Sequence, residues 1–334
     1  MKVDAGIMGD LHTVGDRAAA MEAFGYDGLL TAELSHDPFF PILLAADRTE
    51  RVELATGIAV AFSRNPMILA NIAWDLQEFS GGRFTLGLGS QIKPHIEKRF
   101  SMPWSKPAAR MEDMIDAIHA IWDCWRTGEK LDHRGEFYQH TLMTPMFSPG
   151  VSDHPDPRIT LAAVGPLMTK VAGRVADGFV SHSFQTADYL RDVTLPAIDA
   201  GLAERGRTRD DIEISIPMFV VSGTTEDEVA QRKQGVKQQV AFYGSTPAYK
   251  GVLDHHGWGD VQPELNRMSK EGKWVEMAEV IDDEILSHFA IVAEPGDVAA
   301  EVERRFGGIV DRVQFSADGD PEVWGPVVDA IRAI

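Results

Sequence analysis

The chain has 334 residues and a formal net charge of −19, with 44% hydrophobic and 25% charged residues. Such an acidic chain lacks the basic surface that nucleic-acid binding requires, and its charge also disfavours binding to anionic membranes. No apolar run approaches the roughly 20 residues that span a bilayer, and Asp4 and Asp10 interrupt any N-terminal signal sequence. The only cysteine, Cys124, has no partner for an intramolecular disulfide, so we expect a cytoplasmic protein.

A short β-branched run, a loop and an amphipathic helix alternate along the chain. Strands are predicted at 3–8, 28–32, 52–60, 83–88, 158–163, 178–181, 212–222 and 310–315, and helices at 16–24, 41–48, 66–79, 111–125, 167–176, 186–204, 225–241 and 320–333. Eight strands in alternation with helices, with no second sheet, are typical of a closed parallel (β/α)₈ barrel. We expect one domain over 1–334, in which the segment 243–286 is an insertion able to cover the barrel mouth.

The loop after the second predicted strand carries the first candidate catalytic residues. In (β/α)₈ enzymes the reactive groups come from the C-terminal ends of the strands and the loops that follow them. Asp37 stands before Pro38, and this pair is explained as the start of a helix. Glu33 and His36 have no such local explanation, and a carboxylate beside an imidazole can position and tune a proton donor. We therefore name Glu33 and His36 as candidate catalytic residues.

Glycines mark two further loops at the mouth. Gly57 interrupts the strand 52–60, which indicates either a bulge where a ligand meets the backbone or a twist absorbed by the barrel. Two glycines at 87 and 89 precede Ser90 and Gln91, where backbone N–H groups can form a phosphate-binding nest. The same pattern also occurs in plain turns.

The loops after the fifth and sixth predicted strands complete the set. Gly165 and Pro166 begin a helix, whose free amides and positive dipole end favour an anion, with Lys170 and Arg174 one and two turns on. The alternative is an ordinary helix that begins with proline. His182 follows the strand 178–181. It either contacts a ligand ring or the substrate, or it only closes the mouth. Trp104 and Tyr243 are candidates for an apolar lid over the mouth.

Taken in order, the motifs resemble the luciferase-like monooxygenase family, especially its branch that depends on the deazaflavin coenzyme F420. They are Gly25-Tyr26-Asp27-Gly28, Ala55-Thr56-Gly57-Ile58, Arg64-Asn65-Pro66, Ser80-Gly81-Gly82-Arg83-Phe84 with Leu86-Gly87-Leu88-Gly89, Ala163-Val164-Gly165-Pro166, Ala176-Asp177-Gly178-Phe179, and Phe306-Gly307-Gly308 with Asp311-Arg312-Val313. The resemblance extends over the whole chain. It implies a (β/α)₈ barrel that binds FMN or coenzyme F420 without a Rossmann fold, acts on a small molecule and forms a homodimer.

The resemblance also implies roles for individual residues. A cis peptide at Gly57-Ile58 would form a bulge behind the central deazaflavin ring, and the family's phosphate site maps onto backbone amides at 90–91 and 164–165. The expected cofactor-binding residues are Gly57, Ile58, Val60, Ser90, Gln91, Val164, Gly165, Pro166 and His182.

One departure bears on the substrate. Sugar-phosphate dehydrogenases of the family carry an Asp-His pair after the second strand, where this chain has Glu33 and Leu34. His36 is the nearest imidazole, so we expect a coenzyme F420-dependent reductase or dehydrogenase of another small organic substrate, with Glu33 or His36 handling one proton. The alternatives are an FMN-dependent monooxygenase, which uses reduced flavin and oxygen, and a non-catalytic deazaflavin carrier. A metal-dependent hydrolase would need a His-x-His motif on the first strand, which Asp10-Leu11-His12 does not provide, so no metal site is expected.

Overall fold

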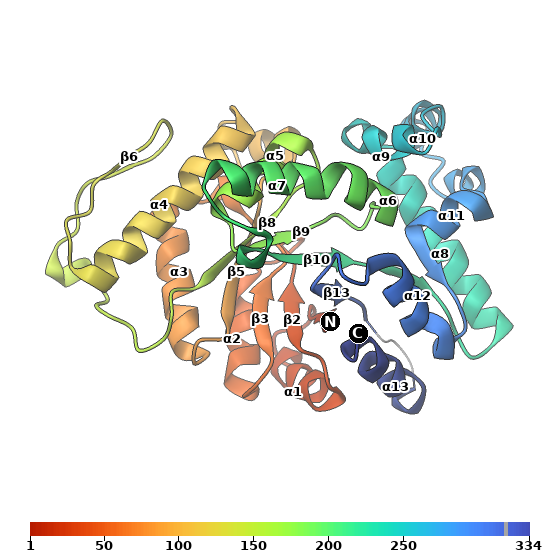
Figure 1. Cartoon of the computed structure of the whole chain (residues 1–334), viewed down its shortest axis with the longest axis horizontal. Helices are drawn as coiled ribbons and strands as arrows, with labels where there is room; N and C mark the ends of the chain where they lie inside the picture. The colour runs from red at the N-terminus through yellow and green to blue at the C-terminus, as the bar shows by residue number, and fades with distance from the viewer. Residues whose placement is uncertain (317–319) are drawn as a thin grey trace.

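Eight parallel strands close into a barrel in the computed structural model, which describes residues 1–316 and 320–334. The barrel strands are β1 (Lys2–Gly6), β2 (Gly28–Thr31), β3 (Glu53–Thr56), β5 (Phe84–Gly89), β8 (Arg158–Ala162), β9 (Gly178–Val180), β10 (Glu213–Pro217) and β13 (Arg312–Gln314). The ring is complete because β13 pairs with both β10 and β1, and β3 pairs with β5 (Figure 1). The predicted (β/α)₈ barrel is confirmed.

Helices surround the barrel, most of them at the places that the hydrophobic periodicity indicated. They are α1 (Val14–Phe24), α2 (Phe39–Arg48), α3 (Pro66–Phe79), α4 (Pro107–Thr127), α5 (Pro166–Val175), α6 (Ala187–Tyr189), α7 (Leu195–Glu204), α12 (Val298–Phe306) and α13 (Pro321–Arg332). The start of α3 shows why: the Asn65 side chain accepts a hydrogen bond from the Ile68 amide at 3.0 Å, and proline occupies the first turn. In α4 the apolar stripe is core, since Trp122 and Trp125 are both buried.

The segment between β10 and β13 forms a compact helical unit beside the barrel (Figure 1). It contains α8 (Glu226–Gly244), α9 (Lys250–His255), α10 (Val261–Lys270) and α11 (Asp283–Phe289), which pack around a second hydrophobic core. A short strand, β12 (Ala290–Val292), pairs with β11 (Phe219–Val221) in a separate two-stranded sheet. The predicted strand 212–222 is therefore two strands, and neither β12 nor α12 was predicted.

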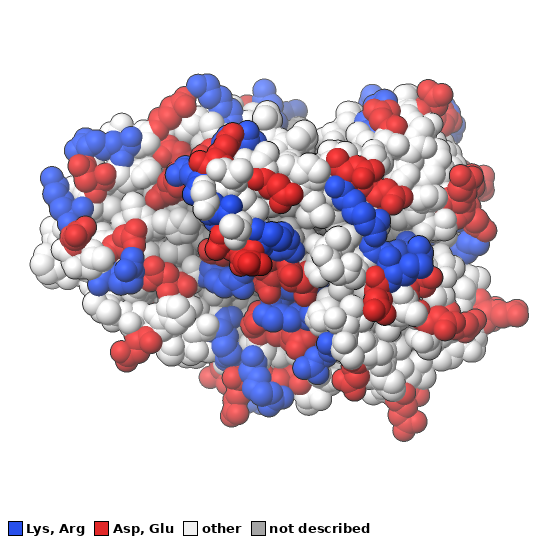
Figure 2. Space-filling model, in the orientation of Figure 1, with Lys and Arg blue, Asp and Glu red and all other residues white. Residues whose placement is uncertain are grey.

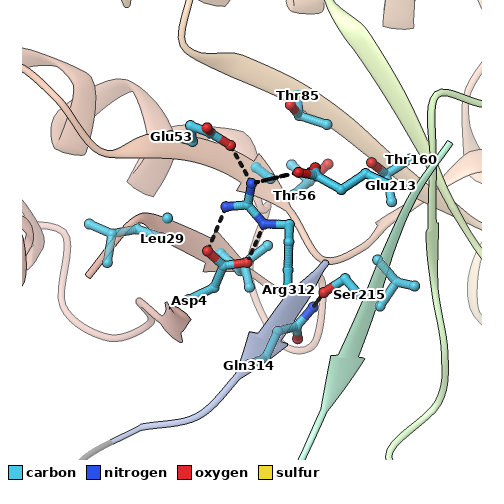
Figure 3. Close-up of a pocket in the computed structure, with 14 residues that line it drawn as sticks. Asp4, Leu29, Glu53, Thr56, Thr85, Thr160, Glu213, Ser215, Arg312 and Gln314 are labelled. Carbon is cyan, nitrogen blue, oxygen red and sulfur yellow. Dashed lines mark hydrogen bonds and ion pairs between the residues drawn. The ribbon is translucent and has the colours of Figure 1, made fainter. Parts of the chain in front are cut away.

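A buried charge network fills the barrel at the N-terminal ends of its strands (Figure 3). Arg312 donates from Nε and Nη2 to the two carboxylate oxygens of Asp4, at 2.8 and 2.6 Å, and its Nη1 also contacts Glu53 and Glu213. Burial lowers the pKa of Arg312, but the bonds and charge of Asp4 outweigh this and raise the pKa above its usual value. The guanidinium therefore stays charged and links β13 to β1, β3 and β10.

The surface carries both signs of charge. On the face shown in Figure 2, Lys and Arg side chains are interspersed with Asp and Glu, with no extended basic patch on this face. Among the described residues, the helices include none with the length and apolar character needed to span a bilayer.

Candidate cofactor and substrate site at the barrel mouth

The third barrel strand ends in a bulge that the loop after β2 holds. The peptide bond between Gly57 and Ile58, which separates β3 from β4 (Ala59–Val60), is cis, as the resemblance implied. The Ile58 carbonyl accepts a hydrogen bond from the Glu33 amide at 3.1 Å, and the Val60 amide donates to Oε2 of Glu33 at 2.7 Å. Four of the predicted site residues, Glu33, Gly57, Ile58 and Val60, thus form one cluster.

Glu33 is committed to an ion pair inside this cluster. Its Oε2 lies 2.6 Å from Nη1 of Arg64, and the two side chains are only 7% and 13% exposed. Arg64 also reaches Asp37 at 2.9 Å and lies over the ring of Phe39. A charge-assisted pair with one further hydrogen bond, from the Val60 amide, fixes the carboxylate in place. The contacts of Glu33 therefore suit a residue that positions the bulge.

Glycines at the end of β5 make room for that bulge. A Cβ on Gly87 would lie 1.7 Å from the carbonyl oxygen of Thr56, and one on Gly89 would lie 2.9 Å from the Ile58 side chain. The Thr56 hydroxyl donates to the Gly87 carbonyl at 2.7 Å and accepts from its amide at 2.9 Å. These two glycines thus permit close approach of neighbouring strands, a reason that the Gly-x-Gly pattern alone did not reveal.

Ser90 and Gln91 turn the chain directly after β5. Gln91 has a φ of 56°, in the left-handed region, and its side chain meets Nδ1 of His95 at 3.1 Å. The Ser90 hydroxyl donates to the Gln91 carbonyl at 3.1 Å. A left-handed residue in such a turn brings consecutive N–H groups towards one side, which is the arrangement that binds an anion.

The start of α5 adjoins this turn, because β5 and β8 are neighbours in the barrel. Gly165 precedes Pro166, is exposed, and has nothing within 4 Å of where a Cβ would lie, so the space before the helix is open. The first-turn amides of a helix have no partner inside the helix and attract anions. Lys170 and Arg174, further along this helix, both form ion pairs with Glu204 on α7.

An uncharged aromatic wall follows β9, two strands along the ring from β5. The His182 ring stacks on Tyr249 at 4.6 Å between centroids and meets Tyr243 edge-on at 4.5 Å. Its Nδ1 accepts a hydrogen bond from the Phe184 amide at 3.0 Å, so the proton of the neutral ring lies on Nε2. Burial lowers the pKa of His182 to about 4, which leaves the ring neutral near pH 7. Tyr243 and Tyr249 belong to the helical unit, so this unit meets the barrel at its mouth.

His36 lines an open pocket of about 890 Å³ between the loops after β1 and β2. The lining is largely apolar, with Met8, Leu11 and Phe40 each partly exposed, and it includes His12. His36 itself is exposed and lies apart from the Glu33 cluster, although Asp37 joins the two through Arg64. The pocket suits a small, mainly apolar molecule that meets an imidazole at its rim.

Sequence reasoning missed two contributors to the site. Arg64 stood inside a family motif, but nothing in the sequence paired it with Glu33. Tyr249 gave no signal, because its role depends on how the helical unit packs against β9. Trp104, predicted as a lid residue, packs edge-on against Phe62, which lies in the turn after β4.

Comparison with known proteins finds relatives that match the chain over most of its length. An uncharacterized protein of Mycobacterium tuberculosis is 51% identical over 313 residues, which cover 94% of this chain and 92% of the relative. The F420-dependent glucose-6-phosphate dehydrogenase of Intrasporangium calvum is 26% identical over 321 residues, covering 92% and 89%. The coenzyme F420-dependent tetrahydromethanopterin reductase from Methanopyrus kandleri has the same fold, with a TM-score of 0.77, 19% identity and coverage of 99% and 96%.

A family model, that of the luciferase-like monooxygenases, matches residues 2–312. The match runs from β1 through the helical unit and ends at Arg312, the first residue of β13. The chain therefore belongs to the luciferase-like monooxygenase family.

Proposed function

We propose that this protein is a coenzyme F420-dependent oxidoreductase that transfers hydride to or from a small, mainly apolar organic molecule. The main support is that the loops after β3, β5 and β8 lie side by side at the barrel mouth. The first loop contains an apolar bulge, and the other two contain open backbone turns. Relatives with about a quarter of their residues identical include the F420-dependent dehydrogenase named above, which supports the proposal.

The residues present fit a tricyclic ring with a phosphorylated tail. Ile58 offers a half-buried apolar side chain at the bulge, and the turn at 90–91 and the start of α5 offer amides for a phosphate without a lysine. This matters because a protein with a net charge of −19 does not attract an anion through its overall field. A deazaflavin, when bound, supplies a carbon that accepts or releases hydride.

The chain itself would position the reactants, exclude water and move one proton. Glu33, through Val60 and Arg64, holds the bulge in place. His182 and Tyr249 close one side with neutral rings, so no charge there draws in water. His36 is the group we assign to proton transfer, since its imidazole is exposed at the pocket while the Glu33 carboxylate is committed to Arg64.

Parallel titrations with coenzyme F420 and with FMN, followed by the absorbance or fluorescence of each cofactor, test the proposal. We expect coenzyme F420 to bind at least about tenfold more tightly, a difference of about 1.4 kcal/mol. The second candidate is an FMN-dependent monooxygenase, which the description of the matching family favours. Tighter binding of FMN would replace the proposal with this candidate. The homodimer stays a prediction.

Glu33 and His36 are expected to respond differently to substitution. Glu33→Ala leaves the largely buried Arg64 without its nearest partner, so the free energy of unfolding should fall by about 3 kcal/mol. Coenzyme F420 should also bind more weakly, because the bulge loses the residue that holds it. Glu33→Gln keeps an acceptor for the Val60 amide and should lose less. Urea unfolding and cofactor titration measure both effects.

The exposed His36→Ala variant is the control for this series. It should change the free energy of unfolding by no more than about 0.5 kcal/mol and leave cofactor affinity unchanged. Equal losses in Glu33→Ala and His36→Ala would contradict the separate roles that we assign to the two residues.

A further inference from the structure

Three potential metal ligands meet where the helical unit packs against the segment after β9, outside the barrel mouth. They are Asp188 in α6, His256 at the C-terminal end of α9, and His288 in α11. One ligand atom from each lies within 4.8 Å of the other two, and the two imidazole rings are 5.0 Å apart between centroids. The cluster leaves no local pattern in the sequence, because its members come from three separate segments.

Both imidazoles are already oriented by partners outside the cluster. Nδ1 of His288 lies 3.0 Å from the carbonyl oxygen of Glu284, a contact in which Nδ1 carries the proton and Nε2 keeps its lone pair. Nε2 of His256 lies 2.8 Å from the hydroxyl of Thr186, and the Tyr189 amide donates a hydrogen bond to the same hydroxyl. Ligand histidines in metal sites are held in this way, with one ring nitrogen bonded to the protein and the other left for the metal.

The cations near the cluster have acidic partners of their own. Arg191 approaches only Oδ1 of Asp188, at 3.3 Å, and Arg304 is paired with Glu301. The surrounding cations are thus engaged with acidic groups.

We propose that Asp188, His256 and His288 bind a divalent transition metal ion of the Zn²⁺ type. Two imidazoles and one carboxylate are ligands that Zn²⁺ accepts, whereas Mg²⁺ requires oxygen ligands. The ion would fasten α9 and α11 to the segment after β9. Because Tyr249 directly precedes α9 and packs on His182, the same ion would hold the aromatic wall of the mouth in place.

Calorimetric titration of the untagged full chain with ZnCl₂, and separately with MgCl₂, tests the site. We expect one equivalent of Zn²⁺ to bind, no comparable binding of Mg²⁺, and affinity for Zn²⁺ at least about tenfold weaker in His256→Ala and His288→Ala. The matched control is His255→Ala, which removes the neighbouring imidazole that pairs with Asp192 instead, and it should bind Zn²⁺ like the wild type.

Far-ultraviolet circular dichroism and the unfolding temperature without metal show whether each variant is folded. If His256→Ala does not fold, Asp188→Asn decides the matter, because this side chain is exposed and its amide is a poorer ligand. Zn²⁺ binding that is unchanged in both His288→Ala and Asp188→Asn, or lost equally in His255→Ala, would overturn the proposal.

Discussion

Gly87→Ala is expected to lower the free energy of unfolding by about 3 kcal/mol or more, the upper end of the range for overpacking. The added Cβ would lie 1.7 Å from the Thr56 carbonyl oxygen, and a backbone atom cannot move aside as a side chain can. Separation of β5 from β3 would also disrupt the two hydrogen bonds of the Thr56 hydroxyl. Urea unfolding measures the loss, and failure to obtain soluble protein would be its extreme form.

The matched control is Gly235→Ala, the same substitution at an exposed position inside α8. Nothing lies within 4 Å of its added Cβ, so stability should stay the same or rise by at most about 1 kcal/mol, because alanine favours helix. A Gly87→Ala variant as stable as the wild type would mean that β3 and β5 do not approach as closely as described, and the bulge at Gly57 would lose its stated support.

Asp4→Ala should cost about 3–5 kcal/mol of unfolding free energy, because it leaves the buried Arg312 guanidinium without its two-bond partner. Glu53 and Glu213 remain near Arg312, which places the expected loss at the lower end of that range. Chemical denaturation near pH 7 is the measurement.

Lys2→Ala serves as the control for Asp4→Ala, since the Lys2–Glu53 pair is about 40% exposed on both sides. Removal of an exposed pair should change stability by no more than about 1 kcal/mol. If Asp4→Ala and Lys2→Ala had similar small effects, the network inside the barrel would not link its strands as proposed.

Local signals made most of the barrel predictable. The start of α5 at Gly165-Pro166 and the cap of α3 at Asn65 depend on residues next to each other in the chain. The strands before these helices likewise show in local runs of apolar residues. The alternation of strand and helix then determined the closed barrel. At Gly57 the residues alone left a bulge and a twist as alternatives, and the cis peptide at Gly57-Ile58 came from the family resemblance.

Long-range pairs were beyond sequence reasoning. Arg64 meets Glu33 from 31 residues away, and Arg312 meets Asp4 from 308 residues away, so neither pair leaves a local pattern. The three-residue strand β12 is too short to show a period. Its pairing with β11 depends on how the helical unit folds back on the barrel.

The most direct test of the central claim is cofactor titration of Gly165→Ala. The added Cβ would occupy the open space before α5, where we propose that backbone amides bind the phosphate, yet it would touch nothing in the protein itself. We predict stability within about 0.5 kcal/mol of the wild type and coenzyme F420 affinity at least about tenfold weaker, with Gly235→Ala unchanged in affinity. Wild-type affinity in Gly165→Ala would contradict the claim that this turn holds the cofactor.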